Sequence, residues 1–157
     1  MASLAFNYVM NLLARREYSE FELRHKMQEK NFTEEDIDQT IQHFQQRHWQ
    51  SDKRFAESYI NARSKRGYGL GRIKQELRQL KGISDETISA VLLEIEGEID
   101  WYALAKKVLT KKFPNYAEKQ TPKAKQKIWN YMFTHGFNSD EFAYLVGKGN
   151  DVDEWEY

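Results

Sequence analysis

The segment Gly82-Ile83-Ser84-Asp85-Glu86 combines a stop signal for one helix with a start signal for the next. Glycine readily takes the left-handed conformation that ends a helix, serine is a favoured N-cap, and acids offset the positive end of the helix dipole. The same arrangement occurs at Asn31-Phe32-Thr33 and at Gly136-Phe137-Asn138, each followed by acidic residues. The three copies lie roughly 50 residues apart, and a repeat of this length has room for three short helices. This spacing predicts a protein built from three helical repeats.

Apolar residues on both sides of the three signals support the repeat, because they recur at the spacing of one helix face. The downstream sets are Phe32, Ile37, Ile41 and Phe44, then Ile83, Ile88, Leu92 and Ile95, then Phe137, Phe142 and Val146. Upstream, Leu23 and Met27 correspond to Ile128 and Met132. The middle repeat places Ile73 and Leu77 one residue earlier, so it contains an extra residue near Leu80.

The other helices carry start signals of their own. Ser19 with Glu22 forms a capping box, Thr121 precedes a proline, and Asp52 and Asp100 are expected to cap the opening helices of the second and third repeats. We expect the first helix to run from near Ser3 to about Arg16 and residues 113–120 to form a loop.

No segment has the β-branched alternation of a strand. We therefore predict an all-α fold of three tandem three-helix repeats that form an elongated, curved helical protein. The predicted repeats span residues 1–50, 51–99 and 100–147, and an acidic tail follows at 148–157.

Composition points to a globular protein of the cytoplasm. The chain has 157 residues, 40% of them hydrophobic and 31% charged, and it contains no cysteine. It has neither a long apolar run nor a secretion signal, so we expect no membrane association. The net charge of zero hides blocks of opposite sign: residues 51–82 hold nine Lys or Arg against three acids, whereas residues 83–102 hold six acids and no Lys or Arg.

The sequence gives little sign of catalysis. Gly67, Gly69 and Gly71 suggest a phosphate-binding loop, but Arg72 occupies the position where a dinucleotide fingerprint needs glycine. These glycines therefore form either an inter-helix turn or a backbone contact to phosphate. The four histidines show no metal-ligand spacing. We predict no catalytic residue, no metal and no cofactor, and hence a protein that is not an enzyme.

A basic cluster around these glycines is the best candidate for a functional surface. Such a cluster attracts a phosphate backbone or an acidic protein surface, and an interleaved aromatic ring can stack on an unpaired base. The alternative is an ordinary solvated helix face. A second group of lysines is more simply explained as solvated: Lys106, Lys107, Lys111, Lys112, Lys123, Lys125 and Lys127. The candidate binding residues are Arg63, Lys65, Arg66, Tyr68, Arg72 and Lys74.

Several motifs resemble those of the RecX family. The opening Leu13-Ala14-Arg15-Arg16-Glu17-Tyr18-Ser19, with Glu22-Leu23 and Lys26-Met27, is similar to the first family signature. The central block is matched by Ser51-Asp52, Arg54-Phe55-Ala56, Arg63, Gly67-Tyr68-Gly69, Arg72-Ile73, Glu76-Leu77 and Lys81-Gly82-Ile83-Ser84. Asp100-Trp101, Ala103-Leu104-Ala105 and Gly136-Phe137 resemble the third unit. Two departures are Asn31 and His48, which replace glycines that the family often has.

The resemblance implies a regulatory protein that binds RecA recombinase filaments on single-stranded DNA and inhibits strand exchange, ATP hydrolysis and coprotease activity, and so regulates DNA repair and the SOS response. It also implies that the basic cluster meets the DNA or the filament, and we expect the protein to act as a monomer. Two alternatives stay open: a helical nucleic-acid-binding module that acts without RecA, and a protein-interaction scaffold without DNA contact.

Overall fold

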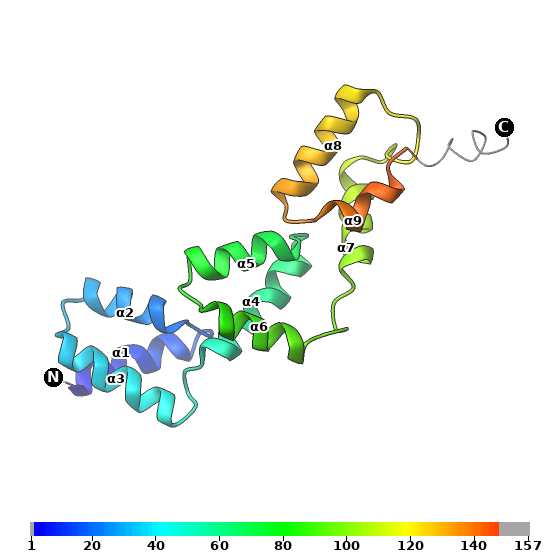
Figure 1. The fold of residues 1–157 in the computed structure, drawn as a ribbon. Helices are drawn as coiled ribbons and strands as arrows, with labels where there is room; N and C mark the ends of the chain where they lie inside the picture. Colours follow the sequence, from blue (N-terminus) through cyan, green and yellow to red (C-terminus); the bar gives the residue numbers. More distant parts are fainter. Residues whose placement is uncertain (1, 148–157) are drawn as a thin grey trace. The chain divides into compact units, whose positions relative to one another are not determined.

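A computed structural model describes residues 2–147 of the chain as a series of helices (Figure 1). The helices are α1 (Ala2–Leu13), α2 (Glu20–Glu29), α3 (Glu34–Gln46), α4 (Asp52–Lys65), α5 (Leu70–Gln79), α6 (Asp85–Glu94), α7 (Trp101–Lys112), α8 (Pro122–Thr134) and α9 (Ser139–Phe142), and a 3-10 turn η1 (Ala143–Leu145) follows. No strand occurs within residues 2–147. The predicted all-α class and the three successive groups of three helices are confirmed.

The helices belong to two compact units. Among the described residues, the first unit comprises residues 2–59 together with Gln75–Glu96, and the second comprises Ile60–Lys74 together with residues 97–147. The division passes through α4 and α5, so each unit contains one whole three-helix group and part of the middle group.

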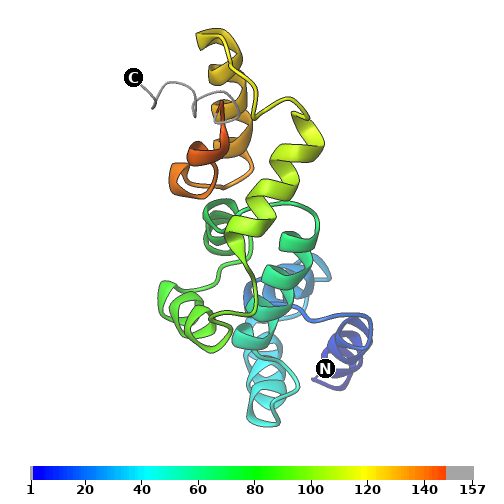
Figure 2. The ribbon, with the colours of Figure 1, turned by 90° about the vertical axis from the view of Figure 1, so that its right-hand side faces the viewer.

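Both outer groups have an apolar core built from the predicted helix faces. In the first unit, α3 packs against α1 and α2 around the fully buried Leu23, Met27 and Phe44. In the second unit, α7, α8 and α9 pack together around Leu109, Met132 and Phe142. Residues 113–120 form the loop between α7 and α8, as expected (Figure 2). The first helix ends at Leu13, earlier than expected.

Most predicted caps are confirmed, because their side-chain oxygens accept main-chain hydrogen bonds at helix starts. These caps are Ser19, Thr33, Ser84, Asp100 and Thr121. The expected role of Asp52 as the cap of α4 is wrong. Ser51 Oγ accepts from Arg54 N at 3.1 Å and caps that helix, whereas Asp52 Oδ1 accepts from Glu20 N at 2.8 Å at the start of α2.

The helix stops also form as predicted. Asn31 and Gly136 have φ of 64° and 96°, and the residue after each donates to the carbonyl five residues back, as in a Schellman motif. In the middle repeat, Ile83 N donates to the carbonyl of Leu77, six residues back, at 2.9 Å. The extra residue predicted near Leu80 is therefore absorbed in this turn, and Leu80 itself is exposed.

Within the first unit, the start of α2 meets the turn that ends α5. The Glu22 carboxylate accepts hydrogen bonds from Lys81 Nζ at 3.0 Å and from Arg16 Nη2 at 3.2 Å. A Cβ added to Gly82 would lie 2.5 Å from the Cβ of Phe21, so the two segments touch closely. We call this contact, formed by Phe21, Glu22, Lys81 and Gly82, the charged joint.

Candidate nucleic-acid interface

All six predicted binding residues belong to the second unit. Arg63 and Lys65 lie in the last turn of α4, Arg66 and Tyr68 lie in the connection that follows, and Arg72 and Lys74 lie on α5. Lys65 and Arg66 are exposed, and the other four are half-buried. Their role in binding stays a prediction.

A glycine turn places this segment. Gly67 has φ of 94°, its N–H donates to the carbonyl of Ser64, and Tyr68 N donates to the carbonyl of Arg63. These two bonds form a Schellman motif that ends α4 and turns the chain sharply. Of the two accounts of the Gly67–Gly71 segment, the inter-helix turn is the one that the structure describes at Gly67.

Gly69 and Gly71 have a different role, because they allow two stretches of main chain to touch. Gly69 N donates to the carbonyl of His135 at 2.6 Å, and Gly71 N donates to that of Gly136 at 3.0 Å. A Cβ on Gly69 would lie 2.6 Å from the carbonyl carbon of Gly136, and a Cβ on Gly136 would lie 2.5 Å from Arg72 N. We call this contact of Gly69, Gly71 and Gly136 the glycine joint.

Tyr68 is the centre of a cation–aromatic cluster beside the glycine joint. The guanidinium carbons of Arg63 and Arg72 lie 4.0 and 4.6 Å from its ring centroid. The His135 ring stacks with it at 5.3 Å and 8°, and His135 stacks in turn with Tyr131 at 4.0 Å. Arg72 also donates to the carbonyl of Thr134 at 3.2 Å. Three predicted residues that are separated in sequence are thus brought together.

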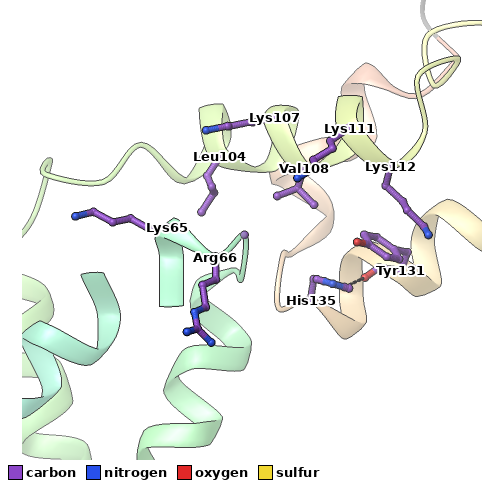
Figure 3. Close-up of a pocket in the computed structure, with 10 residues that line it drawn as sticks. Lys65, Arg66, Leu104, Lys107, Val108, Lys111, Lys112, Tyr131 and His135 are labelled. Carbon is purple, nitrogen blue, oxygen red and sulfur yellow. Dashed lines mark hydrogen bonds between the residues drawn. The ribbon is translucent and has the colours of Figure 1, made fainter. Parts of the chain in front are cut away.

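Lys65 and Arg66 border a pocket of about 400 Å³ in the same unit. The turn at Gly67 forms one side, a face of α7 forms the second, and the last turns of α8 form the third (Figure 3). The lining residues from α7 are Leu104, Lys107, Val108, Lys111 and Lys112, and the other side is lined by Tyr131 of α8 and by His135, which directly follows that helix. Lysines that sequence reasoning treated as simply solvated therefore face the predicted cluster, and their spacing along one face of α7 is the signal that could have revealed them.

Four basic residues of segment 51–82 that lie outside the predicted cluster are held in ion pairs. Within the first unit, Lys53 pairs with Glu94, Arg54 with Glu17, Arg78 with Asp85 and Lys81 with Glu22. The five cations around the pocket, in contrast, have no carboxylate partner within residues 2–147: Lys65, Arg66, Lys107, Lys111 and Lys112. The structure thus separates the basic residues that are paired with a carboxylate from those that have no such partner within residues 2–147.

Two further features bear on the class of protein. Among residues 2–147, no three His, Asp or Glu side chains are grouped as metal ligands. None of the helices that the structure describes combines the length and hydropathy needed to cross a membrane.

Comparison with known proteins identifies related chains. Models of the first, second and third three-helix domains of RecX match residues 5–44, 51–92 and 98–149. A Regulatory protein RecX of Haemophilus influenzae is 63% identical over 99% of this chain and 100% of its own length. That of Mannheimia succiniciproducens is 57% identical over 96% of this chain and 97% of its own length.

Solved structures agree in fold. A crystal structure of regulatory protein RecX, 26% identical, superposes with a TM-score of 0.78 over 92% of this chain and 72% of that one. RecX from Lactobacillus salivarius, at 21% identity, has the same fold with a TM-score of 0.77 over 99% of this chain and 96% of that one. Because the relatives extend over nearly the whole chain and the three domain models follow its helical groups, this chain belongs to the RecX family of regulatory proteins.

Proposed function

We propose that this protein binds RecA nucleoprotein filaments and inhibits strand exchange, ATP hydrolysis and coprotease activity, and so regulates DNA repair and the SOS response. Its membership of a family of regulatory proteins carries the proposal. In this proposal the protein acts by binding, as a cytoplasmic monomer, and catalyses no reaction.

The nucleic-acid contact is assigned to Arg63, Lys65, Arg66, Tyr68, Arg72 and Lys74. Lys65 and Arg66 support this assignment best, because both are exposed and neither has a carboxylate partner within residues 2–147. Such cations gain free energy by replacing the counterions of a phosphate backbone. Arg63 and Arg72 lie against Tyr68, which limits their motion before any ligand arrives.

The deciding experiment measures ATP hydrolysis by RecA on single-stranded DNA at increasing concentrations of the purified protein. We expect inhibition at substoichiometric amounts and a parallel loss of strand exchange. An ATPase rate that stays constant over a wide concentration range would disprove the proposal. If the protein then still bound bare DNA with a steep salt dependence, it would be a nucleic-acid-binding module that acts without RecA.

Charge reversal tests which surface acts. The double variant Lys65→Glu/Arg66→Glu should raise the concentration for half-inhibition at least tenfold, because two favourable contacts to phosphate become repulsive. Lys123→Glu/Lys125→Glu is the matched control, since it reverses two exposed lysines of α8 outside the pocket. If both variants inhibited RecA at the same concentration, the inhibition would be assigned to a protein-interaction surface elsewhere on the chain.

A further inference from the structure

The pocket beside the cluster has an apolar floor and a charged rim. Leu104 and Val108 are half-buried and point from α7 toward the turn at Gly67, whereas the charged ends of Lys65, Arg66 and Lys107 lead away from this floor (Figure 3). On the far side, the rings of Tyr131 and His135 form an aromatic wall. A ligand that fits this arrangement has a flat apolar part and anionic groups at its edge.

The size and charge of the pocket limit the class of ligand that it can bind. About 400 Å³ lies within the range of roughly 300–1,000 Å³ that small-molecule pockets occupy. The lining contains five lysine or arginine residues and no acid, so the anionic groups of the ligand meet no repulsion from it. Lys107 and Lys111 lie one helical turn apart on α7, about 6 Å along its axis, so they can meet successive charges of one ligand.

We propose that this pocket takes up an unpaired base of a single DNA strand, with the phosphates on either side of that base bound by the rim cations. This proposal rests on the proposed function, in which the protein contacts filament-bound single-stranded DNA. Leu104 and Val108 remove the faces of the base from water. Tyr131 supplies an aromatic surface of the kind on which bases stack in single-strand-binding proteins, without selecting one base over another.

Lys112 contacts the Tyr131 ring on which the base would stack, and it would bind a phosphate of the strand instead. Its Nζ lies 5.4 Å from the centroid of the Tyr131 ring, and its side chain is exposed. A cation–aromatic contact at an exposed site is weak, so the ammonium group exchanges readily from the ring to a phosphate. His135 stays in position, because it stacks with Tyr131 and its Nδ1 donates to the Tyr131 carbonyl at 2.9 Å.

The first test compares two fluorescently labelled strands of equal length and charge, one of thymidines and one of abasic sites. Fluorescence anisotropy of the full-length protein should show about tenfold tighter binding of the thymidine strand, because only that strand has a base to bury. Equal affinities would overturn the proposal, since they would leave phosphate attraction as the whole interaction.

Filling the pocket is the second test. Val108→Phe places a ring where the base would lie, and it should lower the affinity for the thymidine strand to that for the abasic strand. Ala103→Phe is the control, because Ala103 is exposed on α7 and does not line the pocket. An unchanged preference for thymidine in Val108→Phe would overturn the proposal.

A measurement on the unaltered protein avoids any folding defect of the variant. The methyl NMR signals of Leu104 and Val108 should shift with the thymidine strand and stay in place with the abasic strand. No shift with either strand would overturn the proposal. Free thymidine triphosphate tests the source of the nucleotide: displacement of the strand at equal concentration would assign the pocket to free nucleotides and overturn the single-strand assignment.

The rim is tested by salt dependence. Lys107→Ala/Lys111→Ala should reduce the slope of log affinity against log salt concentration by about 1.4, from roughly 0.7 for each phosphate contact on a single strand. Lys106→Ala/Lys123→Ala, which removes the same charge outside the pocket, should leave the slope unchanged. An equal slope change in both variants would overturn the assignment of the rim.

Failure of this proposal is distinguishable from failure of the proposed function. A base preference without inhibition of RecA would support the pocket and contradict the RecA role. Inhibition of RecA without a base preference would support the RecA role and overturn the pocket.

Discussion

Lys81 Nζ donates a hydrogen bond to the Glu22 carboxylate across 3.0 Å and 59 residues of sequence. The equivalent place in the second unit contains no charge pair but the main-chain contact of Gly71 with Gly136. Counted from Leu23 and Ile73, Phe21 corresponds to Gly71, and the turn glycine Gly82 corresponds to Gly136. In the first unit, the start of α2 meets the turn that ends α5, and in the second unit, the start of α5 meets the turn that ends α8. The first contact is made by charged side chains and the second by main chain.

The charged joint should make folding stability depend on pH. Burial alone would raise the pKa of Glu22, but hydrogen bonds from Arg16 and Lys81 outweigh burial and lower this pKa. A lowered pKa in the folded state gives stability that is present above the ordinary pKa of about 4.3 and is lost as the pH falls toward the folded-state value. Glu22→Gln should remove this dependence and cost about 1–3 kcal/mol at pH 7.

Urea unfolding at several pH values measures this effect. Glu29→Gln is the control, because Glu29 is exposed on the same helix. If the free energy of unfolding changed with pH in the same way in Glu22→Gln and in the unaltered protein, the charged joint would not contribute to the pH dependence of stability.

The glycine joint should reject any side chain. Gly136→Ala should destabilise the protein by more than 2 kcal/mol, because its Cβ would lie 2.5 Å from Arg72 N in addition to the strain of a left-handed residue. Gly97→Ala is a matched control: Gly97 has φ of 86° and nothing within 4 Å of an added Cβ, so it isolates the backbone strain of about 1 kcal/mol. Thermal unfolding measures the loss of stability in both variants. Equal losses in Gly136→Ala and Gly97→Ala would contradict this account.

Arg54 should affect stability and leave DNA binding unchanged. Its guanidinium pairs with Glu17 and donates to the carbonyls of His48 and Trp49 at 2.9 and 3.0 Å. Arg54→Ala should therefore lower the free energy of unfolding by about 1–3 kcal/mol, with single-strand affinity within twofold of the unaltered protein. A large loss of affinity in the folded variant would place Arg54 in the interface.

The Tyr68 ring should matter through its faces and not through its hydroxyl group. Tyr68→Phe should retain single-strand affinity, because the ring still supports Arg63 and Arg72. Tyr68→Ala should weaken affinity about five- to thirtyfold, since each of the two cation–aromatic contacts contributes on the order of 0.5–1 kcal/mol to placing the guanidinium groups. Anisotropy titrations that found the two variants equally weakened would implicate the hydroxyl instead.

The parts of the fold that depend on local chemistry could be predicted from the sequence. Asn31, Gly82 and Gly136 all have positive φ, as their place at the helix stops requires. The role of Asp52 could not be predicted, because its partner Glu20 lies 32 residues away and no local pattern reveals that hydrogen bond. The predicted boundaries between repeats, at residues 50 and 99, stay a prediction.

The candidate site was predictable only in part, for the same reason. The sequence gives Lys53, Lys65 and Lys81 equal weight as cations of one basic block. Only the folded chain brings Glu94 to Lys53 and Glu22 to Lys81, and leaves Lys65 facing the lysines of α7. Which cations remain available is a property of tertiary contacts, and local spacing does not contain it.

The two joints also differ in how mutation can change them during evolution. The ion pair of the charged joint is made by side chains, so an exchange of residues at Glu22 or Lys81 can strengthen, weaken or reverse it by small steps. The glycine joint has no side chains to exchange, and every base change in a glycine codon that alters the residue adds at least a Cβ where main chain already lies. The ion pair of Glu22 and Lys81 is open to gradual adjustment by mutation, whereas the glycine joint tolerates a single residue type at Gly69 and Gly136.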